Sequence, residues 1–130
     1  MIVVDSSVWI ANLRGLDTQP VRKLQTFVEA NDDVLIGDLI LLEVLQGARD
    51  HPHAARIERS LRCFPVAAML NEHVAVTGAH HYRTLRALGI TIRKTVDVII
   101  GTFCIQGGHR LLHDDRDFDP MVRHLGLHTA

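Results

Sequence analysis

The chain has 130 residues, of which 47% are hydrophobic and 22% are charged, a composition typical of a globular domain with its own core. Its 14 basic and 15 acidic side chains give a formal net charge of −1, which excludes a general basic field, so any nucleic-acid binding must rest on a local patch. No apolar run approaches the roughly 20 residues of a membrane span and no basic signal-peptide region opens the chain, so we expect a cytoplasmic protein without membrane contact.

Short strands and helices alternate along the chain. In order we expect a strand over 1–4, helices over 6–15 and 18–31, a strand over 34–37, helices over 38–48 and 53–62, an edge strand over 63–67, helices over 71–88 and 95–108, a strand over 110–113, a short helix over 119–124 and a last strand near Leu127. Asp38, Asn71, Thr95 and Asp119 are the predicted helix N-caps. This alternation predicts one α/β domain over 1–130, with a parallel sheet between helices on both faces.

Two aspartates follow predicted strands. Asp5 comes directly after the first strand, and Asp115 lies two residues after the fourth, with Asp114, Asp117 and Asp119 close by. In parallel sheets ligands bind beyond the carboxyl ends of the strands, so these aspartates lie where chemistry is expected. For Asp5 a helix N-cap, and for the others a solvated loop, is the structural alternative.

Two further carboxylates lie on apolar helices. Glu43 in "LILLEVLQG" and Asp97 in "VDVIIGTF" each have a glycine four residues later, at Gly47 and Gly101, which would leave open space beside the carboxylate. We expect the helix of Glu43 to be buried nearly all round. An ionised carboxylate there is costly unless it is paired, for example with an arginine, or bound to a metal.

These four carboxylates could converge at one end of the sheet. Uncompensated, they would repel one another strongly at close range. Mg²⁺ or Mn²⁺ would relieve that repulsion, because hard divalent cations prefer carboxylate and water oxygens. A site of this kind suits phosphodiester hydrolysis, in which a metal activates a water and neutralises charge on the leaving oxygen.

Four motifs carry a resemblance to a known family. In this order, "MIVVDSSVWI", "LLEVLQGA", "TVDVIIG" and "LLHDDRDFD" resemble the motifs of PIN-domain ribonucleases, and of the VapC toxins of type II toxin–antitoxin pairs in particular. The resemblance covers essentially the whole chain and implies a PIN-like three-layer α/β/α domain with about five strands. It also implies a Mg²⁺- or Mn²⁺-dependent endoribonuclease that cuts structured RNA, such as tRNA or rRNA loops. A homodimer and a cognate VapB-like antitoxin that occludes the site are the implied partners.

The resemblance assigns roles by motif. The implied catalytic acids are Asp5, Glu43, Asp97 and Asp115, and the implied metal ligands are Asp5, Asp97, Asp115 and Asp117. The Ser7 hydroxyl is implied to hold Asp5 or a water. It stays open which of Asp114, Asp115 and Asp117 contacts the metal, although Asp115 is favoured. It also stays open whether the site holds one metal or two. Gly101 stands where the family frequently has alanine.

Arg93 and Lys94 immediately precede the third motif and, with Arg116, could form the local basic patch that contacts the RNA backbone. The two cysteines, Cys63 and Cys104, form no CxxC pattern and are expected to be buried, reduced thiols.

Other functions fit the sequence less well. A receiver-like signalling module would need an aspartate after the third strand, and "CFPVAAML" has none. A phosphohydrolase with an aspartyl nucleophile would place D-x-D after the first strand, where the chain has "DSSVW". The nine histidines lack an HExxH pattern or a CxxC partner for zinc. An inactive PIN domain that serves only as an interaction surface remains the alternative to a nuclease.

Overall fold

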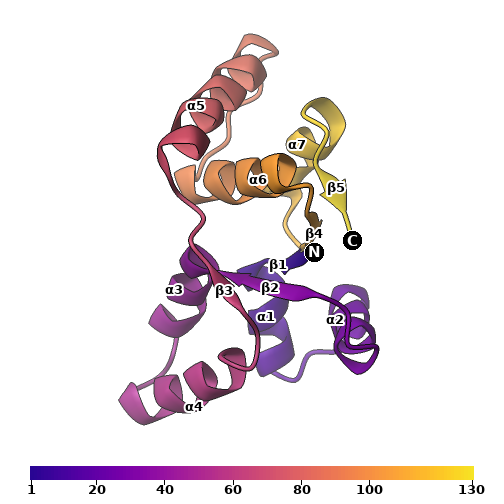
Figure 1. Ribbon diagram of the computed structural model, residues 1–130, viewed down its shortest axis with the longest axis vertical. Helices are drawn as coiled ribbons and strands as arrows, with labels where there is room; N and C mark the ends of the chain where they lie inside the picture. Colours follow the sequence, from indigo (N-terminus) through magenta and orange to yellow (C-terminus); the bar gives the residue numbers. More distant parts are fainter.

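A five-stranded parallel sheet lies at the centre of the computed structural model, which describes residues 1–130 (Figure 1). Its strands are β1 (Ile2–Val4), β2 (Val34–Gly37), β3 (Val66–Ala67), β4 (Arg110–Leu112) and β5 (His128–Thr129). The spatial order is β3-β2-β1-β4-β5 and every neighbouring pair is parallel. From β1, the chain therefore adds β2 and β3 on one side and then β4 and β5 on the other. The switch point falls between β1 and β4, whose carboxyl ends are the place for a ligand in such a sheet.

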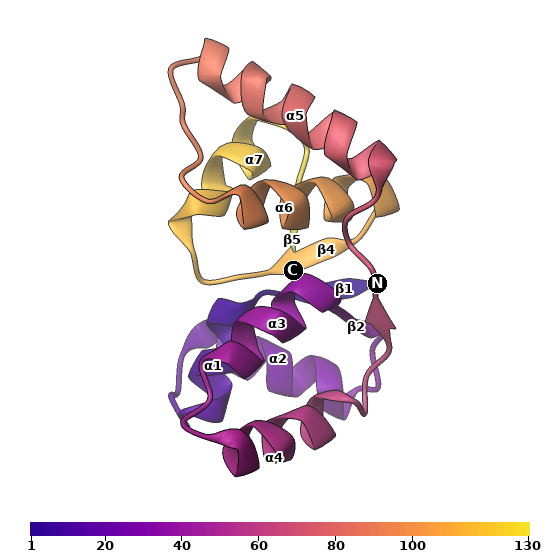
Figure 2. The same ribbon diagram turned by 90° about the vertical axis from the view of Figure 1, so that its left-hand side faces the viewer.

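Helices cover both faces of the sheet (Figure 2). They are α1 (Ser6–Leu13), α2 (Gln19–Glu29), α3 (Asp38–Gln46), α4 (His51–Leu61), α5 (Glu72–Ala87), α6 (Thr95–Gly107) and α7 (Asp119–His124), with a short 3₁₀ helix, η1 (Arg116–Phe118), before α7. The first four helices lie on one face and α5, α6 and α7 on the other. The predicted three-layer α/β/α architecture with about five parallel strands is confirmed.

The core follows from this double covering. A single cluster of 25 buried residues includes Val3, Val4 and Ile36 of the central strands, all with no exposed surface. Strands β1 and β2 read as continuous apolar runs because a parallel strand covered on both faces has no solvent side. No helix is both long enough and apolar enough to span a membrane.

Three of the four predicted N-caps lie one residue off. Asn71 caps α5 as predicted, because its side chain accepts a hydrogen bond from the first turn of that helix. Asp38, Thr95 and Asp119 are instead the first residues of their helices. Asp38 uses its carboxylate to accept bonds from the backbone N–H groups of Leu39, at 2.8 Å, and of Met69, at 3.1 Å. It thus ties α3 to the segment after β3.

Two burial predictions were wrong. Cys104 is buried, and its burial raises the pKa of its thiol to about 12, but Cys63 is exposed. Cys63 lies in the turn after α4, because β3 begins only after Pro65 and spans two residues instead of the predicted five. Helix α3 is not buried all round: Leu42 is 58% exposed, and only Ile40 and Val44 of this helix are fully buried.

Candidate active site

Asp5 joins the end of β1 to the start of α1. Its backbone N–H donates to the carbonyl oxygen of Leu112, 2.9 Å away at the end of β4. Its carboxylate Oδ2 accepts from the Ser7 backbone N–H at 3.1 Å and from the Ser7 hydroxyl at 2.6 Å. The capping role and the placement at the sheet edge therefore coexist. With 3% of its surface exposed, Asp5 is held in one orientation.

Ser7 also fixes the loop after β4. Its hydroxyl oxygen accepts a hydrogen bond from the Asp114 backbone N–H at 3.1 Å while donating to Asp5. One hydroxyl thus connects the loop that follows β4 to the helix that follows β1. This places the acidic stretch after β4 beside the end of β1.

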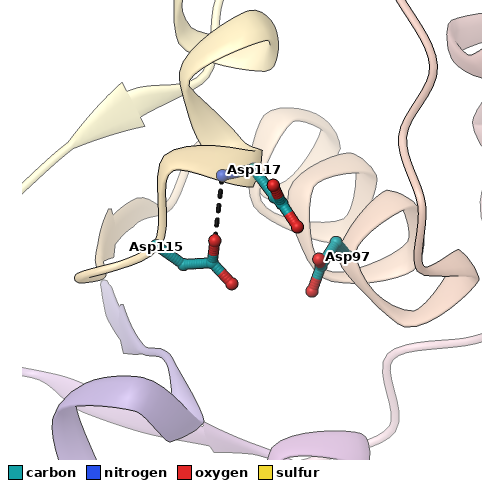
Figure 3. Close-up of side chains that lie close together, drawn as sticks. All are labelled: Asp97, Asp115 and Asp117. Carbon is teal, nitrogen blue, oxygen red and sulfur yellow. Dashed lines mark hydrogen bonds between the residues drawn. The ribbon is translucent and has the colours of Figure 1, made fainter.

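Three aspartates come together at this edge. Carboxylate oxygens of Asp97, Asp115 and Asp117 lie within 4.8 Å of one another, and the side chains point into one space (Figure 3). We call these residues the aspartate cluster. Asp97 projects from the first turn of α6, whereas Asp115 and Asp117 come from the start of η1. Asp115 Oδ1 accepts from the Asp117 backbone N–H at 2.9 Å, which orients its other oxygen into the cluster.

Asp5, Glu43 and Asp114 are not members of the aspartate cluster. Asp114 is exposed and contributes its backbone N–H to Ser7. Glu43 is half-buried on α3, and its Oε1 accepts from the Ser6 hydroxyl at 3.2 Å. Ser6 is a contact that sequence reasoning missed. The only available signal was the pair of serines after Asp5, of which we singled out the second.

Two carboxylates at this edge, Asp97 and Glu43, have raised pKa values. Burial is the main cause that raises the pKa of Asp97 to about 6; the Lys94 ammonium opposes this rise, and the charges of Asp5, Asp115 and Glu43 add to it. Burial, followed by the charge of Asp5, likewise raises the pKa of Glu43. The acids of the other three motifs are therefore close enough to Asp97 for their charges to raise its pKa.

The glycines one turn after Glu43 and Asp97 have different surroundings. A Cβ at Gly47 would meet only two backbone oxygens, at 3.6 and 3.9 Å, which are ordinary van der Waals contacts. A Cβ at Gly101 would lie 2.1 Å from Met121 Sδ. The expectation of open space beside Asp97 was therefore wrong, since Gly101 makes room for a buried methionine of α7.

Two of the predicted RNA-binding cations contact the aspartate cluster. Arg93 Nη2 lies 3.2 Å from Asp117 Oδ1, and Lys94 Nζ lies 3.5 Å from Asp115 Oδ2 and 3.7 Å from Asp97 Oδ2. Arg116 is exposed and has no carboxylate within 4.0 Å. The basic residues are thus grouped around the acids, and Arg116 alone of the three is free of an ion pair.

The donor set fits a hard divalent cation. Asp97 Oδ2 is buried and has no hydrogen-bond partner, and such an oxygen is costly unless something binds it. The ammonium 3.7 Å away is too distant for a hydrogen bond. The cluster offers only carboxylate oxygens, which are the ligands that Mg²⁺ and Mn²⁺ prefer.

Comparison with known proteins gives this geometry a family. The sequence model of the PIN-domain family matches residues 2–123 of the chain. The chain belongs to the PIN-domain family. This PIN domain is similar to VapC ribonuclease Mb1587 of Mycobacterium bovis and to ribonuclease VapC11 of Mycobacterium tuberculosis. Each is 31% identical over 136 residues, covering 100% of this chain and 98% of the relative.

Solved structures share the PIN fold. VapBC-1 from nontypeable Haemophilus influenzae superposes with a TM-score of 0.75 at 18% identity, covering 100% of this chain and 97% of that one. VapBC2 from Rickettsia felis, bound to a DNA fragment from its promoter, gives a TM-score of 0.72 at 15% identity, covering 100% and 98%. At these identities the likeness establishes the arrangement of strands and helices.

Proposed function

We propose that the chain is a VapC-type, metal-dependent endoribonuclease formed by a single PIN domain over residues 1–130. The observation that carries the proposal is the aspartate cluster, with its buried and unpartnered Asp97 oxygen, at the switch point of the sheet. The two VapC ribonucleases that match over the full length of the chain support the same conclusion.

Asp97, Asp115 and Asp117 would hold Mg²⁺ or Mn²⁺, and Asp5 lies beside them as a further ligand or as a partner for a metal-bound water. When bound, the cation would lower the pKa of a water and neutralise charge on the phosphate and the leaving oxygen. Ser7 would keep Asp5 oriented, since it bonds the same carboxylate oxygen through both its N–H and its hydroxyl.

Glu43 is the candidate general base. Its Oε1 is held by Ser6, which leaves Oε2 available to accept a proton from the attacking water. Its raised pKa makes it a stronger base than an ordinary glutamate, and half-burial keeps it within reach of a substrate. Ser6 is therefore proposed as the residue that positions the base.

The substrate would be structured RNA, such as a tRNA or rRNA loop, in the cytoplasm. Lys94, Arg93 and Arg116 surround the acids and supply the cations that a phosphate backbone requires. We further propose a VapB-type antitoxin as the inhibiting partner, which the shared fold with VapBC-1 and VapBC2 supports, and a homodimer as the assembly.

Cleavage of total cellular RNA with 5′-end mapping tests the nuclease proposal. Wild type should give discrete cuts in Mg²⁺ or Mn²⁺ and none in EDTA, and Asp97→Asn should abolish them. Asp114→Asn is the matched control, because this exposed neighbour lies outside the aspartate cluster and should leave cutting intact. Equal cutting by wild type and Asp97→Asn, or none by either, would instead support an inactive PIN domain that serves as an interaction surface.

A further inference from the structure

Lys94 lies across the aspartate cluster. It is the residue directly before α6, and its ammonium contacts Asp97 in the first turn of that helix and Asp115 before η1. Its side chain remains 55% exposed, so the ammonium enters the site from solvent and is not walled in by the protein. Asp97, by contrast, has only 4% of its side chain exposed.

The contacts of this ammonium are loose. Strong bonds between an ammonium and a carboxylate measure about 2.7–2.9 Å, whereas Lys94 Nζ stands 3.5 and 3.7 Å from its two partners. Asp97 Oδ2 consequently has no hydrogen-bond partner despite the nearby charge. The lysine therefore compensates the charge of the carboxylates without donating a hydrogen bond to Asp97 Oδ2. A compact cation bound directly to that oxygen would do both.

We propose that Lys94 is an internal counter-ion of the aspartate cluster, which stabilises the acids before a divalent cation binds and is displaced by that cation. This inference rests on the proposed metal-dependent function and adds a regulation to the same site. Lys94 then sets the metal affinity of the protein by competing for the same carboxylates.

Charge and flexibility both favour displacement over coexistence. A divalent cation coordinated by Asp97 and Asp115 would lie at short range from an ammonium that contacts the same two carboxylates, and the like charges repel. The lysine stem has four carbons and freely rotatable bonds, so Nζ can swing outward without moving the backbone of α6. Lys94 can therefore stay beside the two carboxylates when no metal is bound, and it can leave when a divalent cation binds them.

Arg93 provides the matched comparison. It is the preceding residue and carries the same charge, but its guanidinium contacts only Asp117, and 80% of its side chain is exposed. It has no contact with the buried Asp97. Removal of Arg93 therefore reports the effect of a cation that contacts only Asp117, and any excess effect of removing Lys94 reports competition at Asp97 and Asp115.

The test measures Mn²⁺ binding by calorimetry, without RNA, for wild type, Lys94→Met, Lys94→Gln and Arg93→Met. Both Lys94 variants should bind Mn²⁺ at least about fivefold more tightly than wild type, the lower end of typical couplings between two ligands. In EDTA they should also melt at a lower temperature than wild type, because the acids lose their counter-ion. Arg93→Met should show a clearly smaller change in both measurements.

If wild type binds Mn²⁺ and the Lys94 variants bind it equally or more weakly, the counter-ion proposal is wrong. The proposed function would still stand. Equal tightening by Arg93→Met would also overturn the counter-ion proposal, since the contacts of Lys94 with Asp97 and Asp115 would then have no effect beyond that of a cation on Asp117. If wild type itself bound no Mn²⁺, the proposed metal-dependent function would fail together with this inference.

Discussion

Asp97 combines burial, a raised pKa and an unpartnered oxygen, and its ionisation should therefore govern the stability of the metal-free protein. Its pKa of about 6 in the folded chain exceeds the ordinary value of 3.8. The folded state thus binds a proton more tightly than the unfolded state, and the free energy of unfolding falls as pH rises from about 4 to beyond 6.

Replacement of Asp97 should therefore stabilise the metal-free protein. In EDTA at pH 8, Asp97→Asn should raise the melting temperature, because it eliminates a buried charge; each 1 kcal/mol corresponds to about 4 °C in a domain of this size. At pH 4 the two proteins should melt alike, since Asp97 is then mostly protonated. Thermal melts at both pH values check this, and a lower melting temperature of Asp97→Asn at pH 8 would contradict it.

Metal affinity should depend on pH through the same side chain. A divalent cation binds the ionised carboxylate, so protons and metal compete for Asp97. Mn²⁺ affinity should therefore fall about tenfold for each pH unit below about 6 and level off above it. Calorimetric titrations at pH 5, 6, 7 and 8 measure this dependence. An affinity that stays constant between pH 5 and 6 would indicate that Asp97 is not a ligand.

Helix packing, at the scale of elements, distinguishes the two glycines. Gly101→Ala should lower the free energy of unfolding by about 1 kcal/mol, because overpacking against buried Met121 costs about 1–3 kcal/mol and the better helix propensity of alanine returns about 1 kcal/mol. Gly47→Ala, where the added Cβ makes only ordinary contacts, should leave stability unchanged or raise it. Urea denaturation of both variants tests the pair, and similar losses in both would contradict the packing argument.

Elements were predictable from sequence where the signal was local. The apolar runs of β1 and β2, and the Asn71 cap of α5, depend on neighbouring residues and were confirmed. Features that depend on distant residues were not predictable. Met121, which occupies the space beside Gly101, comes from α7 at the far end of the chain.

The candidate site follows the same division. Asp5 and Asp115 could be named because parallel strands bring their carboxyl ends to one edge, and Glu43 and Asp97 because a carboxylate on an apolar helix is costly unless it is paired or bound to a metal. The partition into an aspartate cluster and two neighbouring acids, the Ser6–Glu43 bond and the ion pairs of Arg93 and Lys94 depend on side-chain geometry. Sequence patterns carry no such information.

The charge of the whole molecule limits how it can bind RNA. With a net charge of −1, only the three cations around the acids are expected to neutralise phosphates, each contributing a slope of about −0.7 on single-stranded RNA. The logarithm of RNA affinity should therefore fall with the logarithm of salt concentration at a slope of about −2. Fluorescence anisotropy across a salt series measures it. A slope of about −6 would contradict this, because it would require many more cations at the RNA than these three.

The chemistry at the ends of the cut RNA tests most directly the central claim that a metal held by these acids directs water at the phosphate. If water is the nucleophile, every fragment should carry a 5′-phosphate or a 3′-hydroxyl at the cut, and cutting should stop in EDTA. Mass spectrometry of the fragments from wild type decides this. A 2′,3′-cyclic phosphate, formed without metal by the 2′-hydroxyl of the RNA, would contradict the account and assign the aspartate cluster another role.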